Sequence, residues 1–237
     1  MQSKNQIFCF TYAGGNAGFF DVLDDELPGF DVIKLEYAGH GSRRKEPYYS
    51  DFTELADDMY AVIKNRWNGA DYALFGYSMG SIGLVEVLTR ILEGQEINPP
   101  MQVFLAANEP FNNNNYLSIP SAKLDEWAKQ RTIDFGAVPE KLIDNKIFWR
   151  TYLPLYLADY AIIGKYQFEN LHLSSKIPAH VFYSETDTRF EDMKLWKNYF
   201  IGECDFHCFE GNHLFFQQHH AAISEIILAA MGRSSSN

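Results

Sequence analysis

Short apolar segments alternate with amphipathic segments along the chain. The apolar runs that have the length of a strand cover residues 6–12, 31–37, 73–77, 101–107, 179–184 and 205–209. Between the second and third runs, apolar side chains from Phe52 to Val62 recur at helical spacing, and Asp51 with Glu54 forms an expected amino-terminal cap. Because strands and helices alternate, the pattern predicts an α/β fold whose central sheet is mostly parallel and covered by helices on both faces.

The third apolar run ends in Gly76-Tyr77-Ser78-Met79-Gly80, and a helical apolar pattern follows it. The G-x-S-x-G spacing between a strand and a helix predicts a sharp turn that exposes the Ser78 hydroxyl above the sheet edge. The helix that begins there directs its free N–H groups and its positive dipole end at the same point. The alternative is a glycine-rich turn without chemical meaning, which the apolar strand and helix around it disfavour.

A second glycine-rich segment, residues 13–18, follows the first apolar run. It contains neither G-x-G-x-x-G nor the lysine of a phosphate-binding loop, so a nucleotide site is not indicated. Glycines allow backbone N–H groups to approach a ligand atom closely. We therefore expect the Ala13 N–H to face the Met79 N–H and to form an oxyanion hole with it.

The strand pattern stops between residues 121 and 169, where short amphipathic segments are divided by Gly136 and Pro154. Short helices joined by loops are typical of a cover over an active site. The sequence therefore predicts a single domain over residues 1–237, with a helical lid inserted at about 112–170. Alternatively, the same segment simply adds to the hydrophobic core of the domain.

A serine hydroxyl attacks a carbonyl only with a base in reach, and the imidazole of histidine, whose ordinary pKa is about 6.5, suits that role. The base in turn needs a carboxylate that fixes its tautomer. Ser78, Asp187 and His213 occur in the expected chain order, each just after an apolar run. Glu109 is a competing acid, because it also follows a strand. The histidines that compete with His213 lie in turns, strands or helices: His172, His180, His207, His219 and His220. His40 lies in the loop after the second run, beside the cationic residues discussed below.

The formal net charge of −11 argues against a nucleic-acid ligand, which requires a basic face. No run is apolar and long enough to span a membrane, and no signal-peptide core is present, so we expect a cytoplasmic protein. Three cysteines, one of them in a strand, suit reduced thiols. The set Cys204, His207, Cys208 and His213 suggests zinc, but alternation along a strand turns His207 away, so we expect neither metal nor cofactor.

Five motifs in order carry a family resemblance that extends from about residue 7 to residue 225. They are Thr11-Tyr-Ala-Gly-Gly15, Gly39-His-Gly-Ser-Arg43 with Glu46-Pro47, Gly76-Tyr-Ser-Met-Gly80, Leu153-Pro-Leu-Tyr-Leu-Ala-Asp159 and Gly211-Asn-His-Leu-Phe-Phe216. In these motifs the chain resembles the type II thioesterases, which are discrete editing enzymes of nonribosomal peptide and polyketide synthase pathways. These enzymes are related to medium-chain fatty acyl thioesterases.

The resemblance implies the α/β-hydrolase fold, with Ser78 as nucleophile, His213 as base and Asp187 as acid. It also implies that the Ala13 and Met79 N–H groups form the oxyanion hole. In that family the substrate is an acyl group held as a thioester on the phosphopantetheine arm of a carrier protein. The implied protein is thus a monomeric thioester hydrolase without cofactors, whose partners are the acyl-loaded carrier proteins of a synthase.

Carrier domains tend to be acidic, and this chain is acidic as well. Arg43, Arg44 and Lys45 form a cationic cluster that we expect to meet the arm's phosphate or the carrier surface. A solvated loop is the alternative for this cluster. Two other functions remain open: an acyl-CoA thioesterase or small-molecule esterase with the same three residues, and a non-catalytic interaction protein on a hydrolase scaffold.

Overall fold

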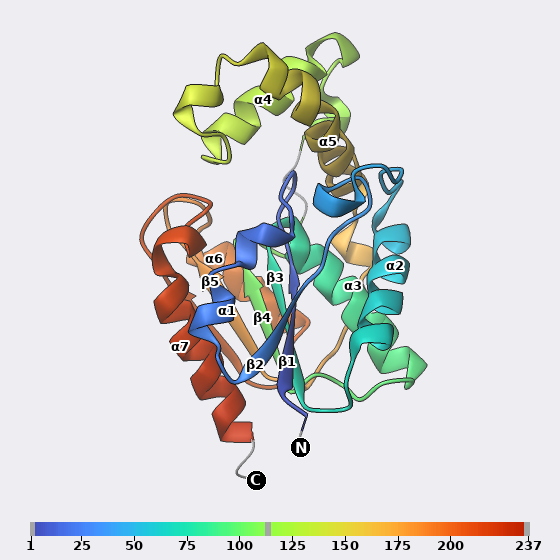
Figure 1. Cartoon of the computed structure of the whole chain (residues 1–237), viewed down its shortest axis with the longest axis vertical. Coiled ribbons are helices and arrows are strands. Elements are labelled where there is room, and N and C mark those ends of the chain that lie inside the picture. The colour runs from blue at the N-terminus through green and yellow to red at the C-terminus, as the bar shows by residue number, and fades with distance from the viewer. Residues whose placement is uncertain (1–2, 112–114, 235–237) are drawn as a thin grey trace.

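A six-stranded sheet forms the centre of the computed structural model, which describes residues 3–111 and 115–234 (Figure 1). All paired strands are parallel, in the order β2-β1-β3-β4-β5-β6. The strands are β1 (Asn5–Phe10), β2 (Phe30–Lys34), β3 (Tyr72–Tyr77), β4 (Gln102–Ala106), β5 (Ala179–Tyr183) and β6 (Cys204–Cys208). The six apolar runs thus form the six strands, and the predicted parallel α/β architecture is confirmed.

Helices pack on both faces of the sheet (Figure 1). The long helices α2 (Phe52–Arg66) and α3 (Met79–Gly94) lie on one face, and α1 (Leu23–Glu26) and α7 (Phe216–Ser234) lie on the other. A short α6 (Phe190–Met193) follows β5. Short 3₁₀ helices lie at Ala17–Phe20, Gly41–Arg43, Tyr116–Ser118, Ser121–Lys123, Glu140–Leu142, Phe168–Asn170 and Lys194–Asn198.

Two buried clusters fill the space between the sheet and these helices. Side chains alternate along β1, so Phe8 and Phe10 join the cluster beneath α2 and α3, whereas Ile7 and Cys9 join the cluster beneath α7. Burial of apolar surface on both faces is what favours the continuous apolar strands seen in the sequence.

Residues 115–170, which we call the helical insertion, lie between β4 and β5 and sit beyond the carboxyl ends of the strands (Figure 1). They contain α4 (Leu124–Asp134) and α5 (Lys146–Lys165). Residues 112–114 of the predicted insertion are outside the described residues. The expected break at Pro154 is wrong, because α5 runs through it as one helix of 20 residues. Arg150 and Pro154 are both exposed, so the helical hydrogen bond that Pro154 cannot donate to the Arg150 carbonyl is missing at the surface of the molecule.

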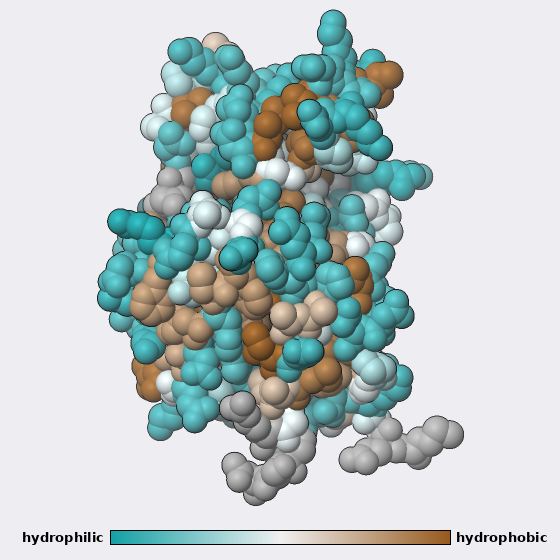
Figure 2. Space-filling view, turned by 90° about the vertical axis from the view of Figure 1, so that its left-hand side faces the viewer, coloured by the Kyte–Doolittle hydropathy of each residue, from teal (hydrophilic) through white to brown (hydrophobic). Residues whose placement is uncertain are grey.

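The helical insertion has a small core of its own. Its buried members are Ala128, Val138, Trp149, Leu153, Tyr156 and Tyr160. On the face shown in Figure 2, hydrophilic side chains surround hydrophobic ones, which are exposed both on the insertion and on the body of the molecule, that is, the sheet with its flanking helices. Among the helices of residues 3–111 and 115–234, we find none with the length and apolar character needed to cross a membrane.

Candidate active site

Ser78 occupies the turn between β3 and α3 in a strained backbone conformation, with φ 54° and ψ −121°. The turn is tight: a Cβ on Gly80 would lie 2.1 Å from the carbonyl oxygen of Phe10, and a Cβ on Gly76 would lie 2.6 Å from that of Gly80. The Ser78 N–H donates to the Ala106 carbonyl at 2.7 Å, which fixes the turn to β4. The sequence therefore folds into a nucleophile elbow because only glycine fits on either side of the serine.

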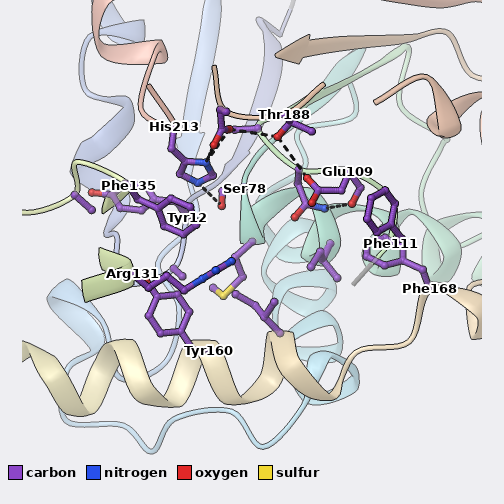
Figure 3. Close-up of a pocket in the computed structure, with 18 residues that line it drawn as sticks. Tyr12, Ser78, Glu109, Phe111, Arg131, Phe135, Tyr160, Phe168, Thr188 and His213 are labelled. Atoms are coloured by element: carbon purple, nitrogen blue, oxygen red, sulfur yellow. Dashed lines mark hydrogen bonds and ion pairs between the residues drawn. The ribbon is translucent and has the colours of Figure 1, made fainter. Parts of the chain in front are cut away.

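The imidazole of His213 lies directly above this serine (Figure 3). Its Nε2 is 2.9 Å from the Ser78 Oγ. The loop after β6 holds the histidine, and the Tyr77 hydroxyl donates to the His213 carbonyl at 2.7 Å. On the side of the insertion, the Phe135 ring stacks on the imidazole with 4.2 Å between centroids and 21° between planes. The histidine is thus held by the sheet below and by the insertion beside it.

Asp187 lies on the far side of the imidazole, with its two oxygens 2.9 and 3.0 Å from His213 Nδ1. The N–H groups of Asp187 and Thr188 both donate to the Ser184 carbonyl, at 2.9 and 2.8 Å, and so form the turn after β5. A neutral imidazole donates its proton to the carboxylate from Nδ1, which leaves Nε2 free to accept the serine proton. The structure therefore joins Ser78, His213 and Asp187 in one hydrogen-bonded chain.

Glu109, the competing acid, lies close to these three hydrogen-bonded residues, with the Thr188 hydroxyl between it and Asp187. Its Oε2 is 3.4 Å from the Thr188 hydroxyl, whose oxygen is 3.5 Å from Asp187 Oδ2 (Figure 3). Burial, together with the neighbouring charge of Asp187, raises the pKa of Glu109 above its ordinary value. The carboxylate in contact with the imidazole is that of Asp187.

The other histidines of the sequence prediction make contacts elsewhere. His180 Nδ1 and His207 Nε2 lie 3.0 Å apart, and His220 pairs with Glu26 at 3.1 Å. Cys204 packs against the cluster beneath α2 and α3, whereas His207 stacks on His180 from the opposite side of β6. Within residues 3–111 and 115–234, no three His, Cys, Asp or Glu side chains are grouped as a metal site would require.

A cavity of about 380 Å³ separates the sheet from the helical insertion. Ala13 and Met79, the expected oxyanion donors, both line it beside Ser78. The insertion supplies a largely aromatic wall that the sequence did not single out: Arg131, Phe135, Tyr160, Ile163 and Phe168. The Arg131 guanidinium lies 4.7 Å from the centroid of the Phe135 ring and 5.9 Å from that of Tyr160. Spacing along the chain gave no sign of these residues, because they come from α4, α5 and a 3₁₀ helix and share no single period.

The cationic cluster divides into two environments. The Arg43 guanidinium binds Glu46 at 2.6 Å and Asp58 at 2.7 Å, so its charge is already paired within the body. Glu46 and Asp58 both raise the pKa of Arg43 further. Arg44 and Lys45 are exposed. These two are therefore the members of the cluster that are open to a partner.

Comparison with known families decides the class of the protein. A family described as the thioesterase domain matches residues 5–231. The chain belongs to the thioesterase family. It is accordingly a hydrolase that acts on thioesters, as the sequence motifs predicted.

Named relatives and solved structures agree with this membership. The medium-chain S-acyl fatty acid synthase thioesterase of Rattus norvegicus is 25% identical over 217 residues, which cover 89% of this chain and 81% of the relative. The structure of ClbQ from the colibactin NRPS/PKS pathway has a TM-score of 0.87 and 21% identity, covering 98% of this chain and 99% of ClbQ. The type II thioesterase BorB from the borrelidin biosynthetic cluster has a TM-score of 0.82 and 25% identity, covering 97% and 94%. The α/β-hydrolase fold is thereby confirmed.

Proposed function

We propose that this thioesterase is a type II editing enzyme, which removes aberrant or stalled acyl groups from phosphopantetheinyl carrier proteins of a nonribosomal peptide or polyketide synthase. The observation that carries the catalytic part is the hydrogen-bonded chain of Ser78, His213 and Asp187 at the floor of the cavity. The substrate class is supported by BorB, a type II thioesterase of a biosynthetic cluster, and by ClbQ of an NRPS/PKS pathway.

In the first half of the reaction, Ser78 Oγ attacks the thioester carbonyl carbon while His213 Nε2 takes the serine proton. A C–O bond forms, and the carbonyl electron pair moves to oxygen, where the Ala13 and Met79 N–H groups stabilise the negative charge. Asp187 stabilises the imidazolium that results. The intermediate collapses, the C–S bond breaks, and the phosphopantetheine thiol leaves with the proton from His213. Because a thiolate is a good leaving group, charge stabilisation rather than acid assistance is the main demand on the enzyme.

In the second half, water attacks the acyl-serine carbonyl while His213 takes one proton from the water. The tetrahedral intermediate then breaks its bond to Ser78 Oγ, which regains a proton from His213. The products are the free carboxylic acid and the restored serine. The cavity beneath the insertion accommodates the acyl chain, and the insertion acts as the lid that shields the ester from bulk solvent.

The carrier protein docks at the exposed cationic residues of the loop after β2. Arg44 and Lys45, with Arg43 behind them, provide positive charge for the arm's phosphate or the acidic carrier surface. We further propose that the enzyme acts as a monomer in the cytoplasm, which size-exclusion chromatography and cell fractionation test.

Incubation with a panel of acyl-loaded carrier proteins, followed by intact mass spectrometry of the carriers, tests the function directly. We expect the wild-type protein to convert acyl-carrier to the free-thiol carrier, and Ser78→Ala to leave every carrier loaded. Ser118→Ala, which changes an exposed serine on the helical insertion, is the matched control and should behave as wild type. Unloading by Ser78→Ala at the wild-type rate would contradict the proposal.

Two further measurements separate the alternative functions. For an editing enzyme, kcat/KM for acyl-carrier protein exceeds the values for the matching acyl-CoA and for a small carboxylic ester, whereas the reverse order indicates an acyl-CoA thioesterase or an esterase. A fluorophosphonate probe should label the wild-type protein at Ser78 and should not label Ser78→Ala. An unlabelled wild-type protein would indicate a non-catalytic interaction protein.

A further inference from the structure

The glycine-rich loop that carries Ala13 is held from the side of the helical insertion. The Gly14 N–H donates to Asp159 Oδ2 of α5 at 2.6 Å. Gly14 has a φ of +76°, and a Cβ there would lie 1.8 Å from the Tyr156 ring, so the loop is in direct contact with α5. Ala13 itself packs against the insertion's core. The residue next to the expected oxyanion donor is therefore fixed by one carboxylate of the insertion.

That carboxylate belongs to an almost completely buried ion pair. Asp159 Oδ2 lies 2.9 Å from His40 Nε2, and the side chains of His40 and Asp159 are 1% and 5% exposed. A buried carboxylate is costly unless a cation or several hydrogen bonds compensate its charge. His40, from the loop after β2, supplies that charge, while the Gly14 N–H supplies a hydrogen bond to the same oxygen.

The surroundings of His40 require its protonated form. Its Nδ1 is 2.9 Å from the Ala38 carbonyl oxygen, and its Nε2 faces the Asp159 carboxylate. Both neighbours are acceptors, and a neutral imidazole has only one N–H, so only the imidazolium donates to both. Burial works against this charge, but Asp159, with smaller contributions from Ala38 and Glu36, raises the pKa of His40 above its ordinary value.

The tyrosines around the pair do not change charge where His40 titrates. Burial raises the pKa values of the tyrosines nearest to His40 and Asp159, so they stay neutral: Tyr37, Tyr48, Tyr156 and Tyr160. The remaining carboxylate, Glu36, accepts from the Ala17 N–H at 3.0 Å and from the Ser42 N–H at 3.1 Å. It connects the same two loops beside His40. The titration of His40 is thus the event that alters this network.

We propose that the His40 imidazolium positions the glycine-rich loop through Asp159, so that thioester hydrolysis requires His40 to be protonated. His40 and Asp159 are positioning residues, and the inference rests on the proposed function, in which Ala13 belongs to the oxyanion hole. When His40 loses its proton, one of its two hydrogen bonds is lost and the Asp159 charge is left uncompensated beside the Gly14 N–H. The loop then loosens, and the oxyanion is stabilised less well.

The sign of the pH dependence follows from the raised pKa of His40. The pair is fully formed below the ordinary pKa of histidine and is lost as the pH rises through the higher pKa of His40 in the folded protein. Hydrolysis should therefore show an alkaline limb that comes from His40.

The test is the pH dependence of kcat for an octanoyl thioester of N-acetylcysteamine, corrected for uncatalysed hydrolysis. We expect the wild-type kcat to fall at alkaline pH. His40→Gln should lower kcat at neutral pH by about 10- to 100-fold, which is at most the effect of removing one oxyanion donor. It should also abolish the alkaline limb. Asp159→Asn keeps an oxygen for Gly14 but removes the charge, so it should lower kcat and shift the alkaline limb by about one pH unit toward acid.

Two controls distinguish positioning from general stability. His40→Arg keeps a cation at every pH and should restore activity at alkaline pH relative to His40→Gln. Glu86→Gln removes a different carboxylate, one that pairs with Arg90 and accepts from Tyr166 at the end of the insertion. This variant removes the charge from a link between the insertion and α3 without touching the glycine-rich loop, so its alkaline limb should match that of the wild type.

An NMR titration of the His40 ring in the wild-type protein keeps the test independent of how the variants fold. Its midpoint should coincide with the alkaline limb of kcat. A wild-type enzyme without that limb, a limb unchanged in His40→Gln, or an NMR midpoint more than a pH unit away would overturn the inference. If the wild-type enzyme is active and gives any of these results, only the inference about His40 is contradicted. If the wild-type protein neither hydrolyses thioesters nor reacts at Ser78, the proposed function itself is contradicted.

Discussion

The sheet and the helical insertion face each other across the cavity, and they are built differently. Ser78, Asp187 and His213 stand on loops at the carboxyl ends of strands. A backbone hydrogen bond to β4 fixes the first loop, a bond within the turn after β5 fixes the second, and the Tyr77 hydroxyl fixes the third. The insertion stands on a separate small core, and it places Arg131 and Phe135 in the cavity. From this comparison we propose that the sheet carries the reacting groups, whereas the insertion shapes the space for the acyl chain and holds the glycine-rich loop.

The largest effect should come from the acid of the sheet. Asp187→Asn removes the carboxylate that fixes the His213 tautomer, so kcat should fall by about 10⁴-fold while the fold is retained. Glu109→Gln is the matched change at the competing carboxylate and should have a far smaller effect on kcat, because Asp187 remains bonded to the imidazole. Steady-state hydrolysis of one acyl thioester by both variants shows which carboxylate acts as the acid. Equal losses would show that Glu109 shares the role of acid.

The contrast between the two regions also explains what the sequence could reveal. Each strand of the sheet is a continuous apolar run, and the elbow glycines lie at fixed offsets from Ser78, so the pattern predicted the architecture and the candidate nucleophile. It left Glu109 in competition with Asp187, because both follow a strand and only the fold places one of them at the imidazole. The sequence did not reveal that α5 continues through Pro154, because packing decides that this proline lies on the exposed side of the helix. It also did not connect His40 with Asp159, which are 119 positions apart and meet only in the fold.

The next effect concerns stability of the body. Gly80→Ala places a Cβ 2.1 Å from the Phe10 carbonyl, which belongs to the backbone of a central strand and has little freedom to move. The free energy of unfolding should fall by about 1–3 kcal/mol, toward the upper end, as measured by denaturant titration. Gly94→Ala, in the same helix, is the matched control: its Cβ would meet the Tyr60 hydroxyl at 2.9 Å, at the mobile end of a side chain. Equal destabilisation by the two substitutions would contradict the interpretation of the elbow.

A smaller effect is expected on the insertion side of the cavity. Phe135→Leu removes the ring that stacks on His213, and such stacking contributes about 0.5–1.5 kcal/mol, so kcat should fall by up to about tenfold. KM should change with acyl chain length, because Phe135 also lines the cavity. Phe148→Leu is the control within the same insertion, since Phe148 stacks on Tyr152 rather than on the imidazole. A loss in kcat as large as that of Asp187→Asn would show that the insertion, too, determines the chemical step.

The smallest effect should come from the surface that we propose for carrier docking. Replacing Arg44 and Lys45 together by alanine should raise KM for an acyl-carrier protein by about two- to fivefold at low salt, because exposed ion pairs contribute little each. The effect should disappear at high salt and should be absent for a small acyl thioester. Lys4 and Lys176, which precede β1 and β5 at the opposite end of the sheet, give a control with the same change in charge. Arg43→Ala added to the double variant tests the whole cluster, and unchanged hydrolysis of carrier-bound acyl groups by the triple variant would show that the carrier docks elsewhere.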